Sequence, residues 1–180
     1  IRDIAMTTNA HTLAKLADRL AAAGLSRVNI SIDSVDSARF ARLTRGGDLR
    51  RVLEGIEAAR AAGLTPIRLN AVVLAGENED DLFEMVDFFA PHAADTELRF
   101  IEYMPFEVRL HKSVPGATLR ARLAARTTLI AEGSPGGASG PARYWRLADS
   151  GLLVGFISPL SEHFCASCNR LRLMVDGHLR

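Results

Sequence analysis

The sequence contains little cysteine and no long hydrophobic run. Cys165 and Cys168 are the only cysteines among the 180 residues, which excludes a disulfide-rich secreted scaffold and fits a reducing compartment. The longest apolar stretch, near residues 152–157, is far shorter than the roughly 20 residues that a membrane-spanning helix needs. No signal-peptide pattern is recognisable. We therefore expect a cytoplasmic protein that does not enter a membrane.

Lysine is also scarce, because Lys15 and Lys112 are the only two and nearly all other basic residues are arginines. The net charge is only +1, so the charge balance gives no reason to expect a nucleic-acid partner. Arginine forks bind carboxylates and phosphates through two hydrogen bonds, which would suit an anionic ligand. For most of these arginines, a solvated surface is the simpler interpretation.

Short apolar runs alternate with stretches of helical periodicity in the first part of the chain. The runs lie at residues 4–7, 28–32, 67–74 and 98–103, and the helical stretches at residues 12–23, 49–62 and 80–89. Asp48 is a candidate N-cap for the second helix, and Gly24 and Gly63 are candidate C-caps before the next strand. Alternation of strands and helices predicts a parallel sheet, either a β/α barrel or an open doubly wound sheet.

Polar residues occupy one side of two predicted strands. Asn29 and Ser31 share a side of the run at residues 28–32, and Arg68 and Asn70 share a side of the next run. A parallel strand that is buried on both faces should be nearly all apolar. The pattern favours a barrel with a polar lumen, although a half-exposed strand would show the same alternation. We predict an α/β protein with a partial parallel β/α barrel of TIM-barrel type.

The pattern changes after Met104. A helix at residues 118–125, a loop at residues 134–141 and a hairpin of residues 144–147 and 152–157 predict a small β-rich extension. We expect residues 1–105 to belong to the barrel and residues 106–180 to the extension. The chain begins with Ile1 rather than Met and ends at Arg180, just after an Asp-Gly hairpin signal. From these ends we expect a truncated piece of a longer protein.

Cys165 and Cys168 form a Cys-x-x-Cys motif. Two such thiolates can bind one metal ion or iron–sulfur cluster, but the motif also fits half of a zinc site, a redox dithiol or two structural thiols. Arg170 and Arg172 follow at alternate positions. Their charge would lower the thiol pKa and attract a phosphate beside the metal. In a zinc module, His163 would be the nearest further ligand.

Several strings, in this order along the chain, carry a resemblance to a known family. They are Thr7-Thr8-Asn9, residues 28–33 (Val-Asn-Ile-Ser-Ile-Asp), residues 99–104 (Arg-Phe-Ile-Glu-Tyr-Met) and residues 163–172 followed by Asp176-Gly177. Together they closely resemble the GTP 3',8-cyclases of molybdenum cofactor biosynthesis, which belong to the radical S-adenosylmethionine enzymes. The likeness extends over nearly the whole chain.

The resemblance implies a fold, a reaction and cofactors. The fold is an incomplete β/α barrel closed by a C-terminal extension. An N-terminal [4Fe–4S] cluster binds S-adenosylmethionine, and the 5'-deoxyadenosyl radical takes a hydrogen from C3' of GTP. C3' then attacks C8, giving (8S)-3',8-cyclo-7,8-dihydroguanosine 5'-triphosphate. A second [4Fe–4S] cluster, held by three cysteines, coordinates the guanine. The implied partners are GTP, S-adenosylmethionine and the next enzyme, cyclic pyranopterin monophosphate synthase; a homodimer stays open.

The resemblance also implies residue roles. Cys165 and Cys168 would be two of the three ligands of the second cluster, and Ser31 and Met104 would contact S-adenosylmethionine. The residues that would contact GTP are Thr7, Arg68, Arg170, Leu171 and Arg172. Arg68 stands where the family usually has lysine, and would hold the triphosphate. Asn70 and Arg99 would be neighbours of the site.

Some family features are absent from the sequence. The N-terminal three-cysteine motif and a Gly-Gly-Glu segment are missing, the third cysteine of the second cluster would lie beyond Arg180, and Ala10 replaces a glycine. We therefore expect that the 180 residues alone do not initiate radical chemistry. The alternatives are another radical enzyme with an auxiliary cluster and, less favoured, a zinc-binding interaction module.

Overall fold

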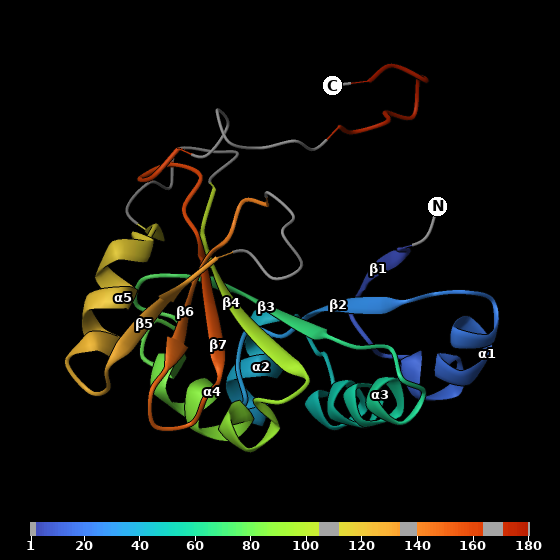
Figure 1. Ribbon diagram of the computed structural model, residues 1–180, viewed down its shortest axis with the longest axis horizontal. Helices are drawn as coiled ribbons and strands as arrows, with labels where there is room; N and C mark the ends of the chain where they lie inside the picture. Colours follow the sequence, from blue (N-terminus) through green and yellow to red (C-terminus); the bar gives the residue numbers. More distant parts are fainter. Residues whose placement is uncertain (1–2, 105–111, 134–139, 164–170, 180) are drawn as a thin grey trace.

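The computed structural model describes residues 3–104, 112–133, 140–163 and 171–179 (Figure 1). Its centre is a seven-stranded sheet with the order β1-β2-β3-β4-β7-β6-β5. The strands are β1 (Ala5–Thr8), β2 (Arg27–Ser31), β3 (Ile67–Val73), β4 (Thr96–Glu102), β5 (Leu129–Glu132), β6 (Arg143–Leu147) and β7 (Leu153–Ile157). Strands β1, β2, β3, β4 and β7 are parallel, whereas β6 and β5 continue the sheet in antiparallel pairs.

Helices lie between the parallel strands and cover one side of the sheet (Figure 1). They are α1 (Ala17–Ala22), α2 (Ser37–Leu43), α3 (Leu49–Ala61), α4 (Asp81–Phe89) and α5 (Gly116–Ala124), with short 3-10 turns η1 (Leu13–Lys15) and η2 (Ala90–His92). Buried helix residues such as Ile56 and Phe89 share one core with strand residues such as Leu69 and Phe100. Each such fully buried side chain contributes about 1.5–3 kcal/mol.

The strand β3 shows how the two faces of the sheet differ. Its residues alternate regularly between buried and partly exposed, so Ile67 and Leu69 face the helices while Arg68 and Asn70 face the other way. This alternation follows from the two-residue period of a strand. The face opposite the helices therefore carries polar side chains, as the sequence pattern predicted.

The predicted helix boundaries are largely confirmed. The Asp48 side chain accepts a hydrogen bond from the Arg50 amide at 3.0 Å and caps α3. Gly24 and Gly63 have positive φ values of 95° and 73° just after α1 and α3. Glycine adopts this conformation without a steric penalty, which explains its use as the residue after a helix.

Three local predictions differ from the structure. Residues 12–23 form η1 and α1 with a break at Leu16, rather than one helix, and Leu13 and Ala17 on either side of the break are both buried. A 3-10 turn at a helix start is common. The helix α2 and the edge strand β5 were not predicted. Phe40 is the one buried residue of α2, and β5 has little apolar alternation, so neither carries a clear periodic signal.

The fold class is mixed α/β with a mostly parallel sheet. Barrel closure and a domain boundary at residue 105 stay predictions, and strands from both sides of that boundary share the sheet. The segment at residues 171–179 lies apart from the sheet (Figure 1), where Leu173 bridges Leu179 around the predicted Asp176-Gly177 turn. Among the described residues, no helix is long and apolar enough to cross a membrane.

Candidate active site

Polar residues from neighbouring strands line up across the face of the sheet that lies opposite the helices. In a first row, Thr7 pairs with Asn29, Asn29 with Arg68, and Arg68 with Glu97. These four residues come from β1, β2, β3 and β4. Because paired residues in adjacent strands point to the same face, their side chains form a continuous polar row. We call this the first polar row.

A second row lies two residues further along the strands. It runs from Ser31 to Asn70, Arg99, Gly155 and Tyr144, and so crosses from β2 to β6. Two residues of a strand span roughly 6.6 Å, so the two rows are within reach of one small molecule. We call this the second polar row, and both rows together the polar face.

Arg68 of the first row is held by a carboxylate. Its Nε donates to Glu97 Oε2 at 2.8 Å and its Nη2 donates to Oε1 at 3.4 Å. The Tyr144 hydroxyl donates to the same Oε2 at 3.1 Å. The side chains of Arg68 and Glu97 are only 14% and 5% exposed. Burial, and next the negative charge of Glu97, raise the pKa of Tyr144, so its hydroxyl keeps its proton.

Arg99 of the second row is held by neutral groups instead. Its Nε donates to Asn70 Oδ1 and its Nη2 donates to Asn29 Oδ1, both at 2.8 Å. Asn29 in turn donates to the Thr7 hydroxyl at 3.4 Å. Burial lowers the pKa of Arg99, but a guanidinium stays charged at neutral pH. Arg99 therefore places a positive charge on the polar face without a directly bonded carboxylate among the described residues.

The close approach of Arg99 to β6 and β7 depends on Gly155. A Cβ atom at this position would lie 2.8 Å from a ring carbon of Tyr144 and 3.2 Å from Cγ of Arg99. Real side chains do not tolerate the shorter of these distances. The absent side chain thus gives the Arg99 stem and the Tyr144 ring room to lie side by side.

The ends of the parallel strands border the polar face. Ser31, the last residue of β2, is exposed, and Met104, two residues after β4, is 50% exposed. Asp33 lies between β2 and β3 and accepts a hydrogen bond from the Val72 amide at 2.9 Å. Burial raises the pKa of Asp33, against the opposing effect of that hydrogen bond.

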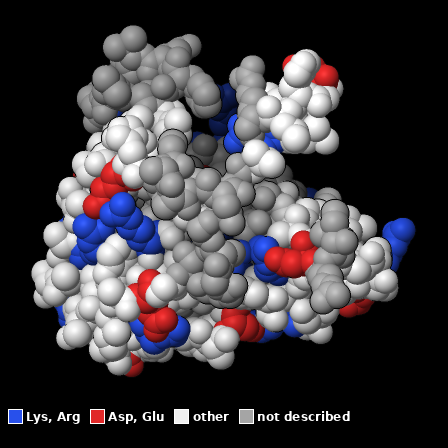
Figure 2. Space-filling model, turned by 45° about the horizontal axis from the view of Figure 1, so that its top comes forward, with Lys and Arg blue, Asp and Glu red and all other residues white. Residues whose placement is uncertain are grey.

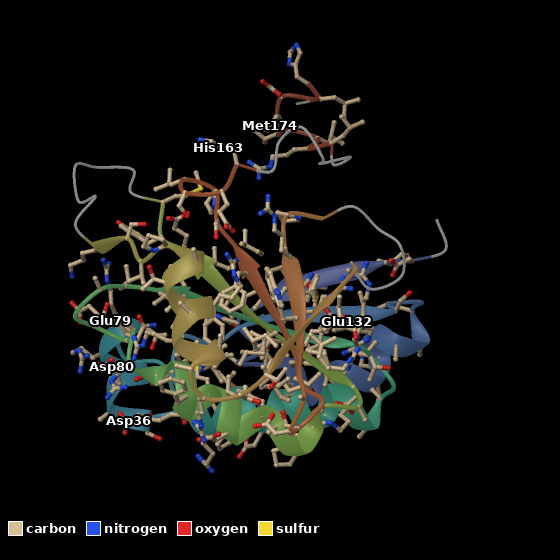
Figure 3. The ribbon with its side chains drawn as sticks, turned by 60° about the vertical axis from the view of Figure 1, so that its left-hand side comes forward. Asp36, Glu79, Asp80, Glu132, His163 and Met174 are labelled. Atoms are coloured by element: carbon tan, nitrogen blue, oxygen red, sulfur yellow. The ribbon has the colours of Figure 1, made fainter. Side chains whose placement is uncertain are left out.

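The structure brings together only some of the predicted site residues. Thr7, Ser31 and Arg68 share the polar face. Leu171, which is 75% exposed, and Arg172 belong to the segment that stands apart from the sheet, beyond His163 and next to Met174 in Figure 3. The contacts with GTP that the resemblance implies for Leu171 and Arg172 therefore stay predictions.

The predictions for Cys165, Cys168 and Arg170 lie outside the described residues. Within the described ranges, no group of three or more His, Cys, Asp or Glu side chains could hold a metal ion. In donor type, two cysteines separated by two residues fit an iron–sulfur cluster, whose ligands are normally thiolates.

Sequence reasoning missed Glu97, Tyr144 and Gly155. The signal for Glu97 was present, because it alternates with Leu98 in the same way as Arg68 alternates with Leu69. No local signal connects Tyr144 with Glu97, since 47 residues separate them. Their contact depends on the pairing of β6 with β7 and of β7 with β4.

Charges on the outer surface are mixed. Figure 2 shows arginine and lysine groups next to aspartate and glutamate groups on the face that it presents. Ion pairs in and next to α4 and α5 also join opposite charges, for example Arg126 with Asp87 at 2.8 Å and Arg122 with Asp80 at 2.9 Å. Exposed pairs of this kind contribute roughly 0–1 kcal/mol each.

Two family models match this chain. Residues 1–89 match the family model described as "Radical SAM superfamily", and residues 96–180 match the one described as "Molybdenum Cofactor Synthesis C". The two matches follow each other along the chain and leave few residues uncovered. The first half of the chain is thus similar to the radical SAM superfamily, and the second half to the molybdenum cofactor synthesis family.

Individual proteins that are similar to this chain include GTP 3',8-cyclases. The chain is 51% identical to a GTP 3',8-cyclase of Pseudomonas putida and 48% identical to one of Pseudomonas entomophila, in each case over 99% of this chain and 54% of the relative. The chain thus spans about half the length of these relatives. A solved structure, described as TYW1 with a lysine-pyruvate adduct bound, has a TM-score of 0.48 at 15% identity, covering 73% of this chain and 43% of that one.

Proposed function

We propose that this chain is the middle and C-terminal part of a radical SAM GTP 3',8-cyclase in molybdenum cofactor biosynthesis. The observation that carries the proposal is the 51% identity to a GTP 3',8-cyclase over 99% of the chain. Because the chain spans 54% of that relative, the activity would belong to a longer protein. We call this chain, together with the segments that would bring it to the length of its relatives, the extended protein.

In the proposed site, the polar face receives GTP. Thr7 would contact the nucleoside, and Arg68 and Arg99 would supply positive charge to the triphosphate, since guanidinium groups bind phosphates through paired hydrogen bonds. Ser31 and Met104, at the strand ends, would contact S-adenosylmethionine. The polar rows support this arrangement because they place Thr7, Arg68 and Arg99 on one face.

The second cluster would be bound by the C-terminal region. Cys165 and Cys168 would supply two thiolates, and Arg170, Leu171 and Arg172 would contact GTP. For Arg172 to do so, the segment at residues 171–179 would have to approach the polar face. The cofactors, when bound, would supply the radical chemistry, while the residues of this chain bind and orient the substrate.

The proposal extends to the architecture and the cellular setting. The sheet would be part of a β/α barrel that the extended protein completes, with the extension beginning near residue 106. The protein would act in the cytoplasm and pass its product to cyclic pyranopterin monophosphate synthase, and it would not need nucleic acid. A homodimer is a further part of the proposal.

The test is anaerobic reconstitution of the extended protein. Iron, sulfide and zinc are quantified, and GTP is followed by mass spectrometry with and without S-adenosylmethionine and reductant. The proposal expects two iron–sulfur clusters and loss of GTP only when both reagents are present. A Cys165→Ser variant should lose iron and GTP turnover but keep cleavage of S-adenosylmethionine. Stoichiometric zinc with unchanged GTP would contradict the proposal and favour a metal-stabilised binding module.

A further inference from the structure

The carboxylate of Glu102 anchors a distant part of the chain to the end of β4. Glu102 is 3% exposed. Its Oε2 accepts hydrogen bonds from the amides of Leu160 and Ser161, both at 3.0 Å, and from the Ser161 hydroxyl at 3.2 Å. Its Oε1 accepts from the Ser113 hydroxyl at 3.5 Å. Hydrogen bonds to an ionised carboxylate are about twice as strong as neutral ones, so this is a firm attachment.

Leu160 and Ser161 belong to a turn at residues 158–162, which we call the anchored turn. The Glu162 amide donates to the Ser158 carbonyl at 3.1 Å, which closes the turn. Its carboxylate then pairs with Arg120 of α5 at 3.3 Å and with Arg143 of β6 at 3.7 Å. The turn is thus attached to β4, α5 and β6 at once.

Close packing fixes the start of the same turn. Ser158 is 2% exposed, and its neighbour Gly116 opens α5. A Cβ at Gly116 would lie 2.2 Å from the Ser158 hydroxyl oxygen, so the turn and the helix approach as closely as a glycine allows. Hydrogen bonds, ion pairs and close packing therefore all fix the position of the anchored turn.

The anchored turn lies just before the Cys-x-x-Cys motif in the sequence. Glu102 lies two residues before Met104, and the turn ends three residues before Cys165. His163, the next residue after the turn, lies on the side of the sheet toward the C-terminal segment (Figure 3). Glu102 therefore connects the strand end beside one proposed cofactor contact to the chain that leads into the Cys-x-x-Cys motif.

We propose that Glu102 is a positioning residue that sets where the Cys165–Cys168 motif begins relative to the end of β4. The carboxylate acts through the anchored turn and does not itself touch substrate or cluster. Its consequence for the second cluster rests on the proposed function, whereas the attachment itself does not. The two parts can therefore be tested separately.

The attachment is tested by amide hydrogen exchange in the metal-free extended protein. Removing the acceptor in Glu102→Ala should speed exchange at Leu160 and Ser161 about tenfold or more. Glu102→Gln keeps a neutral acceptor oxygen and should give an intermediate rate. Glu132→Gln, which neutralises an exposed carboxylate on β5, is the matched control and should leave both amides unchanged. Wild-type exchange at both amides in Glu102→Ala would overturn the inference.

The effect of Glu102 on the second cluster is tested in the extended protein after anaerobic reconstitution. The measurements are the iron content and the ratio of 5'-deoxyadenosine formed to GTP consumed. Glu102→Ala should bind less iron and raise this ratio severalfold, because cleavage of S-adenosylmethionine would continue without productive placement of GTP. Glu102→Gln should restore part of the coupling. Unchanged iron and coupling in Glu102→Ala would refute the positioning role. If the wild type does not consume GTP, the proposed function fails, and the exchange result still decides the attachment.

A milder variant, Ser161→Ala, tests the same attachment in case Glu102→Ala does not fold. Ser161→Ala removes only one of the hydrogen bonds to Oε2 and keeps the buried charge and its two amide donors. It should speed exchange at the neighbouring Leu160 amide, which donates to the same oxygen, by a few fold, in the same direction as Glu102→Gln. No change at this amide would count against the proposed attachment even if Glu102→Ala cannot be purified.

Discussion

Removing the Glu97 carboxylate should strongly destabilise the fold, because it leaves a mostly buried guanidinium without its counter-ion. In Glu97→Ala, the Arg68 side chain, 14% exposed, loses both hydrogen bonds, and the buried Tyr144 hydroxyl loses its acceptor. Breaking a buried pair by deleting one partner costs about 3–5 kcal/mol. Since Arg68 keeps some access to water, we expect about 3 kcal/mol, a large share of a typical total of about 5–15 kcal/mol.

The assay is urea denaturation of the metal-free extended protein, with a matched pair on the surface as control. Glu57 bonds Arg60 but is 63% exposed, so Glu57→Ala should cost less than about 1 kcal/mol. Adding Arg68→Met to Glu97→Ala removes the stranded charge, and the double variant should be more stable than Glu97→Ala alone. The reasoning is refuted if Glu97→Ala loses no more stability than Glu57→Ala, or if the double variant is the less stable one.

Three further changes test the packing, the charge and the capping of this fold. Gly155→Ala should cost about 1–3 kcal/mol in urea denaturation, because the new methyl group would overlap the Tyr144 ring and displace Arg99. Asp33→Asn should raise the Tm at neutral pH, because burial raises the pKa of Asp33 above its ordinary value of 3.8. The wild-type protein is therefore most stable below pH 3.8 with respect to this group, and it loses that stability as the pH rises through the pKa of the folded state. In thermal melts between acidic and neutral pH, the Tm of the variant should depend less on pH than the Tm of the wild type. The same pH dependence in both proteins would contradict the burial argument. Asp48→Ala should cost about 1 kcal/mol through loss of the α3 cap, and a loss under a few tenths would show that the cap is dispensable.

The strands of the parallel sheet could be predicted because their signal is local. The alternation in β3 is set by neighbouring residues, so Arg68 and Asn70 were placed correctly on one side, and so were Asn29 and Ser31 of β2. The stacking of these residues into rows follows from parallel pairing in register. A two-residue period and strand–helix alternation were enough to find this part of the candidate site.

The partners of those residues could not be predicted in the same way. The contact of Tyr144 with Glu97 depends on the order β4-β7-β6, which joins strands far apart in the sequence. The edge strand β5 exposes Ile130 at 50%, so no buried face marked it as a strand. In both cases, tertiary pairing decides the structure, and periodicity within a short window does not contain that information.

For the C-terminal segment at residues 171–179, the sequence predicted the local turn but not its position relative to the sheet. Its Asp176-Gly177 signal predicted the local turn, which the bridge from Leu173 to Leu179 confirms. The large apolar residues of this segment are exposed, with Leu173 at 70% and Val175 at 105%. Hydrophobic burial therefore does not fix the place of the segment on the sheet, and a motif alone predicts the turn but not the distance from Arg172 to the polar face.

The two arginines of the polar face are not equivalent toward an anion. The charge of Arg68 is largely cancelled by Glu97, whereas Arg99 is held by the neutral side chains of Asn29 and Asn70. Arg99 therefore carries the less compensated charge of the two, although it is buried. Arg68 uses its Nε and Nη2 on Glu97, and because a guanidinium has five N–H donors, it still has others to offer. Arg68 can thus bind a phosphate without leaving Glu97, whereas a lysine, as a single point charge, would have to share its ammonium between the two. Under the proposed function, we expect Arg68→Lys in the extended protein to keep the positive charge but to weaken the attachment to Glu97. Steady-state kinetics should then show a KM for GTP that rises more than kcat falls.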